Sequence, residues 1–231
     1  MKKLKLFLWS CFTASALTHT VHAQDWANLK HFQKDNEKVG MPTAGEDRVV
    51  FMGNSITIGW LEARPDFFKG KPYVNRGISG QTTPQMLLRF RQDVVALKPS
   101  VVVLLAGTND IAGNTGPSTL QMIADNIKGM AEIAKMNGIS VVLCSTLPAY
   151  DYPWRPGLRP AQKIVDLNQM LKTYALEQDL VYVDYFSALA DDKNGLPKKY
   201  AEDGIHPTAL GYQVMEPLVE RGIAEALGKR K

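Results

Sequence analysis

The chain has 231 residues, of which 45% are hydrophobic and 22% charged, and its formal net charge is +4. This length suits one globular domain with a substantial core. Three lysines and no acidic residue lie in the first 23 positions, so the net charge of the remainder is only about +1. The balance excludes a strongly basic surface, so we expect no nucleic-acid partner.

The first 23 residues predict a secretory signal peptide. Three lysines precede an apolar stretch over residues 6–17, and residues 21–23 resemble an A-x-A cleavage site. We expect cleavage after Ala23, a secreted or periplasmic protein, and a single domain over residues 24–231. The apolar stretch is too short and too interrupted by Ser and Thr to favour a membrane span.

The chain has two cysteines. Cys11 lies in the leader and leaves a lipoprotein as an alternative, although Trp9 fits a lipid-attachment signal poorly. Cys144 lies in an apolar run and is expected to be a small buried residue. With one cysteine left after cleavage, no intramolecular disulfide can form.

Short apolar runs alternate with longer segments of helical spacing. We expect strands over residues 48–52, 73–75, 100–106, 139–145 and 180–184. We expect helices over residues 83–97, 118–137, 160–178 and 208–227, and another within residues 24–47. Continuous apolar runs such as residues 101–105 are typical of parallel strands covered on both faces. The alternation predicts an α/β fold in which a five-stranded parallel sheet carries helices on both faces.

Small or polar residues follow the first three predicted strands. These are Ser55 after the first, Gly77 after the second and Asn109 after the third. Ligands of parallel sheets bind beyond the carboxyl ends of the strands, so we expect the three residues to converge. Each is ambiguous alone, because Ser55 is also a favoured helix N-cap and the other two are common turn residues.

Ser55, His206 and Asp203 supply the alcohol, imidazole and carboxylate of a nucleophilic serine site. The spacing Asp203-x-x-His206 lets the carboxylate reach Nδ1 and leaves Nε2 for a serine. His31, the other histidine beyond the leader, lies in a polar helical stretch and is expected to be solvated. A surface histidine beside a turn aspartate is the alternative interpretation.

The backbone N–H groups of Ser55 and Gly77 and the side chain of Asn109 are candidate donors to an oxyanion. Asp110 is expected to hold its loop or to cap the next segment. Two histidines without clustered carboxylates do not form the usual catalytic zinc site, so we expect no metal and no other cofactor.

These residues, taken in order, resemble the SGNH hydrolase superfamily, whose members are also called GDSL-like esterases. The matching blocks are Gly53-Asn54-Ser55, Gly77, Gly107-Thr108-Asn109-Asp110 and Asp203-Gly204-Ile205-His206. The resemblance implies a three-layer α/β/α, flavodoxin-like fold and ester hydrolysis through an acyl-enzyme. It implies Ser55, Asp203 and His206 as the triad, and Ser55, Gly77 and Asn109 as the oxyanion hole.

One position departs from the commonest pattern of that family, which has Asp before the serine where this chain has Asn54. The chemistry requires no charge there, so the departure does not remove activity. It makes the chain more similar to the branches that resemble platelet-activating-factor acetylhydrolase and carbohydrate acetylesterases than to long-chain lipases.

An aromatic segment after the fourth strand is the candidate substrate site. Tyr150, Trp154 and Arg155 could stack on and hydrogen-bond a sugar, with Trp60 as a second wall, although the aromatics could equally fix a proline-rich loop. We expect a secreted acetylesterase acting on O-acetylated carbohydrate. A lysophospholipase or thioesterase for longer acyl chains and a non-catalytic glycan-binding protein remain alternatives. The sequence leaves the oligomeric state open.

Overall fold

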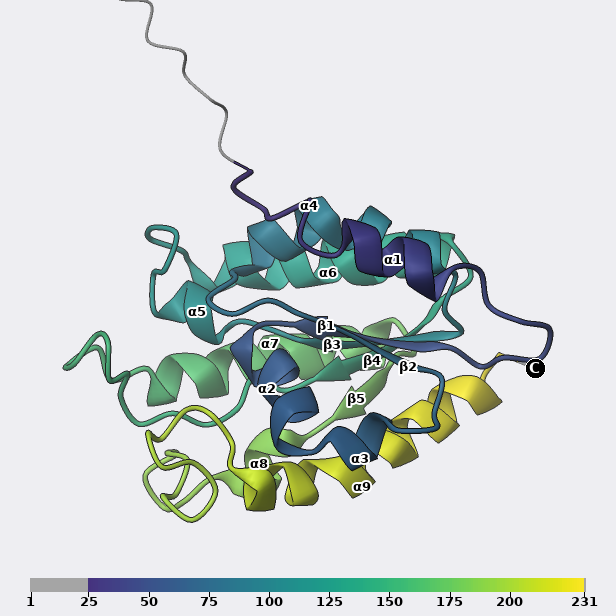
Figure 1. The fold of residues 1–231 in the computed structure, drawn as a ribbon. Coiled ribbons are helices and arrows are strands. Elements are labelled where there is room, and N and C mark those ends of the chain that lie inside the picture. The colour runs from purple at the N-terminus through teal and green to yellow at the C-terminus, as the bar shows by residue number, and fades with distance from the viewer. Residues whose placement is uncertain (1–24, 231) are drawn as a thin grey trace, which may run out of the picture.

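A computed structural model describes residues 25–230 and shows one parallel sheet between two layers of helices (Figure 1). The strand order is β2-β1-β3-β4-β5. The strands are β1 (Val49–Gly53), β2 (Tyr73–Gly77), β3 (Val101–Leu105), β4 (Ser140–Cys144) and β5 (Val181–Val183). The predicted α/β class and five-stranded parallel sheet are therefore confirmed. The predicted signal peptide, with Cys11 and the cleavage site at Ala23, lies outside the described residues.

Helices cover both faces of the sheet (Figure 1). One layer holds α1 (Gln33–Val39), α4 (Thr83–Asp93), the 3₁₀ turn η1 (Val95–Leu97), α6 (Leu120–Met136) and α7 (Ala161–Glu177). The other holds α2 (Ser55–Ala63), α3 (Pro65–Phe68), α8 (Tyr185–Leu189) and α9 (Ala209–Gly228). The short helix α5 (Thr108–Ile111) follows β3. Within residues 25–230, no helix has both the length and the apolar character needed to cross a membrane.

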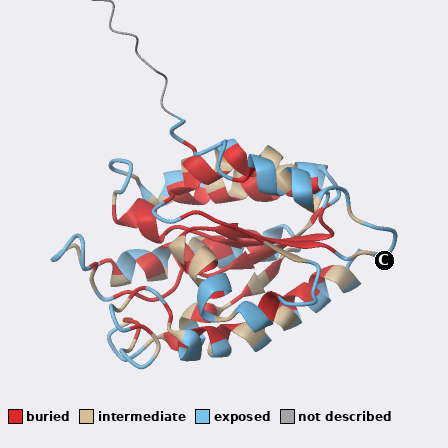
Figure 2. Cartoon of the chain, viewed as in Figure 1, coloured by how far each residue is buried: buried red, intermediate tan, exposed pale blue. Residues whose placement is uncertain are grey.

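Two hydrophobic cores form because successive side chains of a strand point to opposite faces. Val50 and Met52 of β1 pack with α4 and α6, whereas Val49 and Phe51 pack toward α2 and α9. Every residue of β1 and β3 is buried, and Figure 2 shows the strands as a buried layer. Cys144 is buried as predicted, and desolvation raises the pKa of its thiol to about 12.

Two predicted helices differ in extent from the observed ones. The segment 83–97 divides into α4 and η1, because Val94 leaves the helical region with φ −125° and ψ −66°. The helix expected within residues 24–47 is the two-turn α1, which lies over α4. Asn36 fastens it there by donating from Nδ2 to the Gln92 carbonyl, at 3.2 Å, and to Asp93 Oδ1, at 2.8 Å.

A buried arginine ties together the carboxyl ends of the two strands that precede the candidate site. Arg89 Nη2 donates to the carbonyls of Gly53, at 3.1 Å, and Arg76, at 2.9 Å. Its Nε donates to Gln81 Oε1 at 2.5 Å, and its Nη1 pairs with Asp93 at 3.1 Å. Arg89 and Asp93 are both fully buried, so each charge depends on these partners.

We expect Arg89→Met to lower the free energy of unfolding by about 3–5 kcal/mol, because the change removes the cation paired with the buried Asp93 and one donor to each of two carbonyls. Thermal denaturation should show a melting temperature lower by about 10 °C. The matched control is Arg91→Met on the exposed side of the same helix, which should cost less than about 0.5 kcal/mol. Equal melting temperatures for the two variants would contradict this role of Arg89.

Candidate active site

Three side chains from distant parts of the chain form one hydrogen-bonded series. Ser55 Oγ lies 2.9 Å from His206 Nε2, and His206 Nδ1 lies 2.6 Å from Asp203 Oδ2. A carboxylate can only accept, so Nδ1 carries the proton and Nε2 is left as the acceptor for the serine hydroxyl. The structure thus brings together the three residues that the sequence indicated.

Asp203 is fixed as well as paired. Its Oδ1 accepts from the backbone N–H groups of Ile205, at 2.9 Å, and His206, at 2.8 Å. Partial burial alone would raise the pKa of Asp203, but the His206 ring and these two N–H groups outweigh it and leave the pKa lowered. The carboxylate therefore stays ionised and holds the imidazole in one tautomer.

The turn from β1 into α2 positions the serine. Asn54 is the N-cap of α2, with its Oδ1 accepting from Ile56 N at 3.0 Å, and Ser55 is the first helical residue. The alternative in which Ser55 itself caps the helix is wrong. No acceptor within residues 25–230 takes the N–H of Ser55, which lies at the positive end of the helix. Asn and Asp are both favoured N-caps, so Asn54 fills this capping role without a charge.

The prediction that Gly77 donates to an oxyanion is contradicted. Its N–H is buried and already donates to Asn75 Oδ1 at 2.9 Å. Glycine is required there for a different reason, since a Cβ would lie 2.3 Å from Ile58 N and 2.8 Å from Asn54 O. Gly77 therefore lets β2 approach the first turn of α2, and Asn75 links the two elements by donating to Thr57 O at 2.7 Å.

Gly80 has the free N–H that Gly77 lacks. It lies in the left-handed region with φ +76°, in a turn closed by Gln81 N and Ile78 O, and no acceptor within residues 25–230 takes its N–H. The sequence has two glycines in this loop, and only the backbone geometry shows which of them has a free N–H. The preceding residue, Ser79, lines the same cavity as Ser55 and His206.

Asn109 lies beside this turn as expected. Its Nδ2 donates to Gln81 O at 2.9 Å, which uses one amide hydrogen and leaves the second without an acceptor among residues 25–230. Asp110, next in sequence, accepts from Thr83 N and Thr83 Oγ1, so it secures the start of α4. Asp110 is only 2% exposed, and burial raises its pKa to about 6 despite these hydrogen bonds.

A cavity of about 540 Å³ opens at Ser55. One wall runs along α2 from Ser55 to Ala63, and His206 and Pro207 form another. Gly59, Glu62 and Tyr212 are among the lining residues. Trp60 is absent from this lining because it points into the core, where it is 2% exposed and stacks between Phe67 and Tyr212. The prediction that Trp60 forms a wall of the substrate site is therefore wrong.

The other predicted substrate residues lie in an exposed loop. Tyr150, Trp154 and Arg155 are all exposed, and the Trp154 ring lies 6.4 Å from the His206 ring. Arg155 Nη2 contacts Gly113 O at 3.4 Å. The structure thus brings Trp154 to the candidate site, and it gives no ring contact between Tyr150 and His206 among the described residues.

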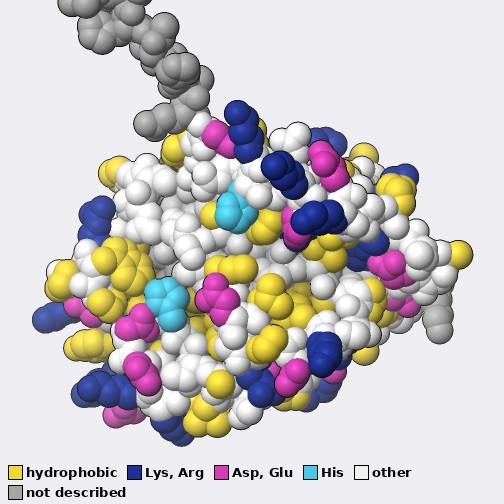
Figure 3. Space-filling model, in the orientation of Figure 1, with side chains coloured by type: hydrophobic (Ala, Val, Ile, Leu, Met, Phe, Trp, Pro, Cys, Tyr) yellow, Lys and Arg dark blue, Asp and Glu magenta, His cyan; other side chains and the backbone are white. Residues whose placement is uncertain are grey.

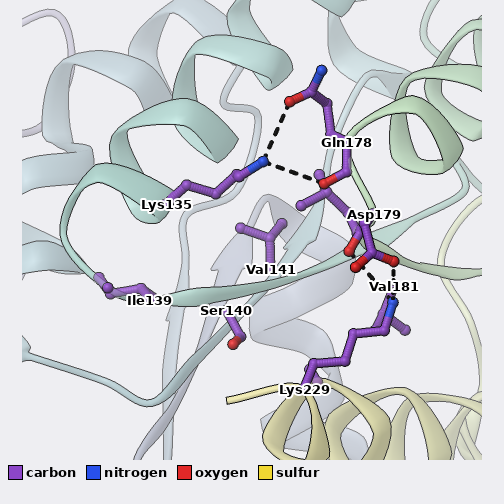
Figure 4. A pocket seen from close by; sticks show the side chains of 11 residues that line it. Lys135, Ile139, Ser140, Val141, Gln178, Asp179, Val181 and Lys229 are labelled. Carbon is purple, nitrogen blue, oxygen red and sulfur yellow. Dashed lines mark hydrogen bonds and ion pairs between the residues drawn. The ribbon is translucent and has the colours of Figure 1, made fainter. Parts of the chain in front are cut away.

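A second cavity, of about 460 Å³, lies at the opposite edge of the sheet, where β4 and β5 begin (Figure 4). Its two lysines are engaged, since Lys135 donates to the Gln178 carbonyl and Lys229 pairs with Asp179. No histidine lines it. Acidic and basic side chains are interspersed over the face shown in Figure 3.

Comparisons with known proteins agree on one family. The model of the GDSL-like lipase/acylhydrolase family matches residues 51–214. A GDSL-like lipase from Bacteroides thetaiotaomicron has a solved structure with 46% identity and a TM-score of 0.84, covering 87% of this chain and 98% of its own. A Bacteroides fragilis protein, classed provisionally as an acylhydrolase, gives 47% identity and a TM-score of 0.87, covering 89% and 100%.

An acetylxylan esterase from Xylanibacter ruminicola is 27% identical over 222 residues. The match covers 79% of this chain but only 45% of that enzyme. The chain therefore spans about half the length of this relative, so the relative's whole activity does not transfer to it directly.

The raised pKa of Asp110 makes stability depend on pH. The folded protein binds this proton up to about pH 6, whereas an unfolded aspartate releases it near pH 4, so this contribution is full below about pH 4 and is lost as pH rises through about 6. We expect wild type to gain stability relative to Asp110→Asn as pH falls from about 7.5 to about 5. Urea denaturation of both proteins measures this, and a difference that stays constant over the range would contradict it.

Proposed function

The chain belongs to the GDSL-like lipase/acylhydrolase family, a family of carboxylic ester hydrolases, and we propose that it cleaves short-chain esters through an acyl-enzyme on Ser55. The observation that carries this proposal is the hydrogen-bonded series from Ser55 through His206 to Asp203. A glycan-binding protein would have no need for an alcohol, a base and an orienting carboxylate in this arrangement.

In the proposed reaction, His206 Nε2 takes the hydroxyl proton while Ser55 Oγ attacks the ester carbonyl carbon. The negative Asp203 stabilises the imidazolium that forms, and the imidazolium then gives its proton to the leaving alkoxide. Water, deprotonated in turn by His206, attacks the acyl-enzyme and releases the acid. The first proton moves along the hydrogen bond already present between Ser55 and His206, and His206 returns a proton to Ser55 Oγ along the same bond when the acyl-enzyme is cleaved.

The proposed oxyanion hole contains the N–H of Ser55, the N–H of Gly80 and the free amide hydrogen of Asn109. Gly80 takes the place first given to Gly77, whose N–H is already used. Gly80 lies between Ser79, which lines the cavity at Ser55, and Gln81, whose carbonyl oxygen accepts a hydrogen bond from Asn109 Nδ2. Donors fixed before the substrate arrives stabilise the developing charge without reorganisation.

We propose O-acetylated carbohydrate as the substrate class, in a secreted or periplasmic protein. Two residues that line the cavity at Ser55, the charged Glu62 and the polar Ser79, support a short acyl group. Both would oppose a long alkyl chain. The acetylxylan esterase relative supports the carbohydrate. Secretion rests on the leader composition of residues 1–23.

Ser55→Ala should lower the turnover of 4-nitrophenyl acetate by about 10⁴-fold or more, because it removes the nucleophile. Asn109→Ala should lower it by about 10²–10³-fold through the loss of one oxyanion donor.

A fluorophosphonate probe should label wild type and Ser79→Ala but not Ser55→Ala. Asn137→Ala, at the end of α6, is the control with unchanged turnover. Full activity of Ser55→Ala would refute the mechanism.

Acyl-chain preference separates the proposed function from its main alternative. We expect kcat/KM for 4-nitrophenyl acetate to exceed that for the octanoate by about tenfold or more, because the Glu62 carboxylate lines the cavity at Ser55 and would oppose a longer alkyl chain there. Initial rates should be measured at octanoate concentrations below the critical micelle concentration of that ester. A preference for octanoate would instead favour a lysophospholipase or thioesterase.

A further inference from the structure

Trp154 is an exposed aromatic ring held rigidly beside the proposed base. It is 41% exposed, and its ring centroid lies 6.4 Å from that of His206. One side of the ring stacks on Tyr152, at 5.0 Å between centroids and 28° between planes. The indole N–H donates to Asn114 Oδ1 at 3.2 Å. An exposed tryptophan restrained on two sides presents a fixed apolar surface to solvent.

The loop that carries this ring is itself braced. Asp151 accepts from the backbone N–H groups of Tyr152, at 3.0 Å, Gly157, at 2.6 Å, and Arg159, at 3.2 Å. Tyr152 is 1% exposed, and its hydroxyl lies 3.1 Å from Thr108 Oγ1. Tyr152, on which Trp154 stacks, is therefore held by Thr108, the residue that precedes Asn109. Such bracing lowers the entropy cost of ordering the loop when a ligand binds.

The same contacts place the ring relative to the reacting atoms. Asn114 joins Trp154 to the proposed oxyanion turn, because it receives the indole N–H and its Nδ2 donates to Gly80 O at 3.3 Å. In ester hydrolysis the alcohol leaves with a proton from the base, so the alcohol part of the substrate must lie next to His206. A ring this close to His206 is placed to contact that alcohol part.

We propose that Trp154 is the platform on which the pyranose ring of the departing alcohol stacks, an inference that rests on the proposed ester hydrolysis. A pyranose offers an apolar C–H face to an aromatic ring and hydroxyl groups at its edge. Arg155 adjoins the platform, and its contact with Gly113 O leaves guanidinium N–H groups for those hydroxyls. Trp154 thus selects the alcohol, while the cavity at Ser55 limits the acyl group.

The kinetic test compares two acetate esters that differ in the alcohol: a fully acetylated methyl xylopyranoside and triacetin, whose alcohol is acyclic. Trp154→Ala should raise KM for the xylopyranoside by about tenfold, and Trp154→Phe, which keeps a ring, by less than about threefold. Both variants should hydrolyse triacetin within about twofold of wild type. Trp26→Ala, a change at another exposed tryptophan, is the matched control. Equal losses on both substrates, or no loss on either, would overturn the platform.

A binding measurement separates this inference from the proposed function. Calorimetric titration of Ser55→Ala with the acetylated xylopyranoside should show binding that weakens about tenfold in Ser55→Ala/Trp154→Ala. If wild type hydrolysed neither acetate while this difference persisted, Trp154 would be a sugar-binding residue, but the esterase proposal and the departing alcohol assigned to the platform would both fail. If hydrolysis occurred and Trp154→Ala bound and reacted as wild type does, the platform would fail alone.

Discussion

The active edge of this protein depends on the buried guanidinium of Arg89. Parallel strands end in carbonyl groups that no further strand residue can satisfy, and Arg89 donates to two of them, on Gly53 and Arg76. It also fixes Gln81, the residue next to the proposed oxyanion turn. The carbonyl of Gly53, two residues before Ser55, accepts a second bond from Ile78 N at 3.2 Å. One charged side chain thereby joins both strand ends and the loop that faces the serine.

Around this fixed edge, residues far apart in sequence meet with the geometry that proton transfer needs. Ser55 and His206 are 151 positions apart, yet their reacting atoms are 2.9 Å apart. Local structure does part of the work, because Asn54 caps α2 and Asp203 holds the backbone of its own turn. Ser55 and His206 come together because α9 packs against α2 in the hydrophobic core on that face of the sheet. The precision of the site therefore comes from the hydrogen-bonded turn at Asp203 and His206 together with the packed layers that hold it against α2.

The proposed substrate site has two parts of different chemistry. The cavity at Ser55 is lined in part by small residues and by the Glu62 carboxylate, which suits a short acyl group. The loop of Trp154 lies by His206 and offers a braced apolar ring. With this arrangement, the protein would recognise the alcohol part of the ester specifically and would restrict only the length of the acyl part.

The sequence by itself determined the α/β class and the parallel sheet, and it predicted that Ser55, Gly77 and Asn109 follow strands at one edge of that sheet. It could do so because apolar runs such as Val101–Leu105 report burial directly and because parallel strands end at one edge. Only the tertiary structure decided which of two glycines offers a free N–H, since Asn75, which accepts from Gly77 N, is held in place by donating to Thr57 O of α2. It also placed Trp60 in the core and Trp154 at the surface, although both are tryptophans near predicted site residues. Local pattern shows that a side chain is apolar, but the face on which an aromatic ring packs depends on contacts between elements distant in sequence.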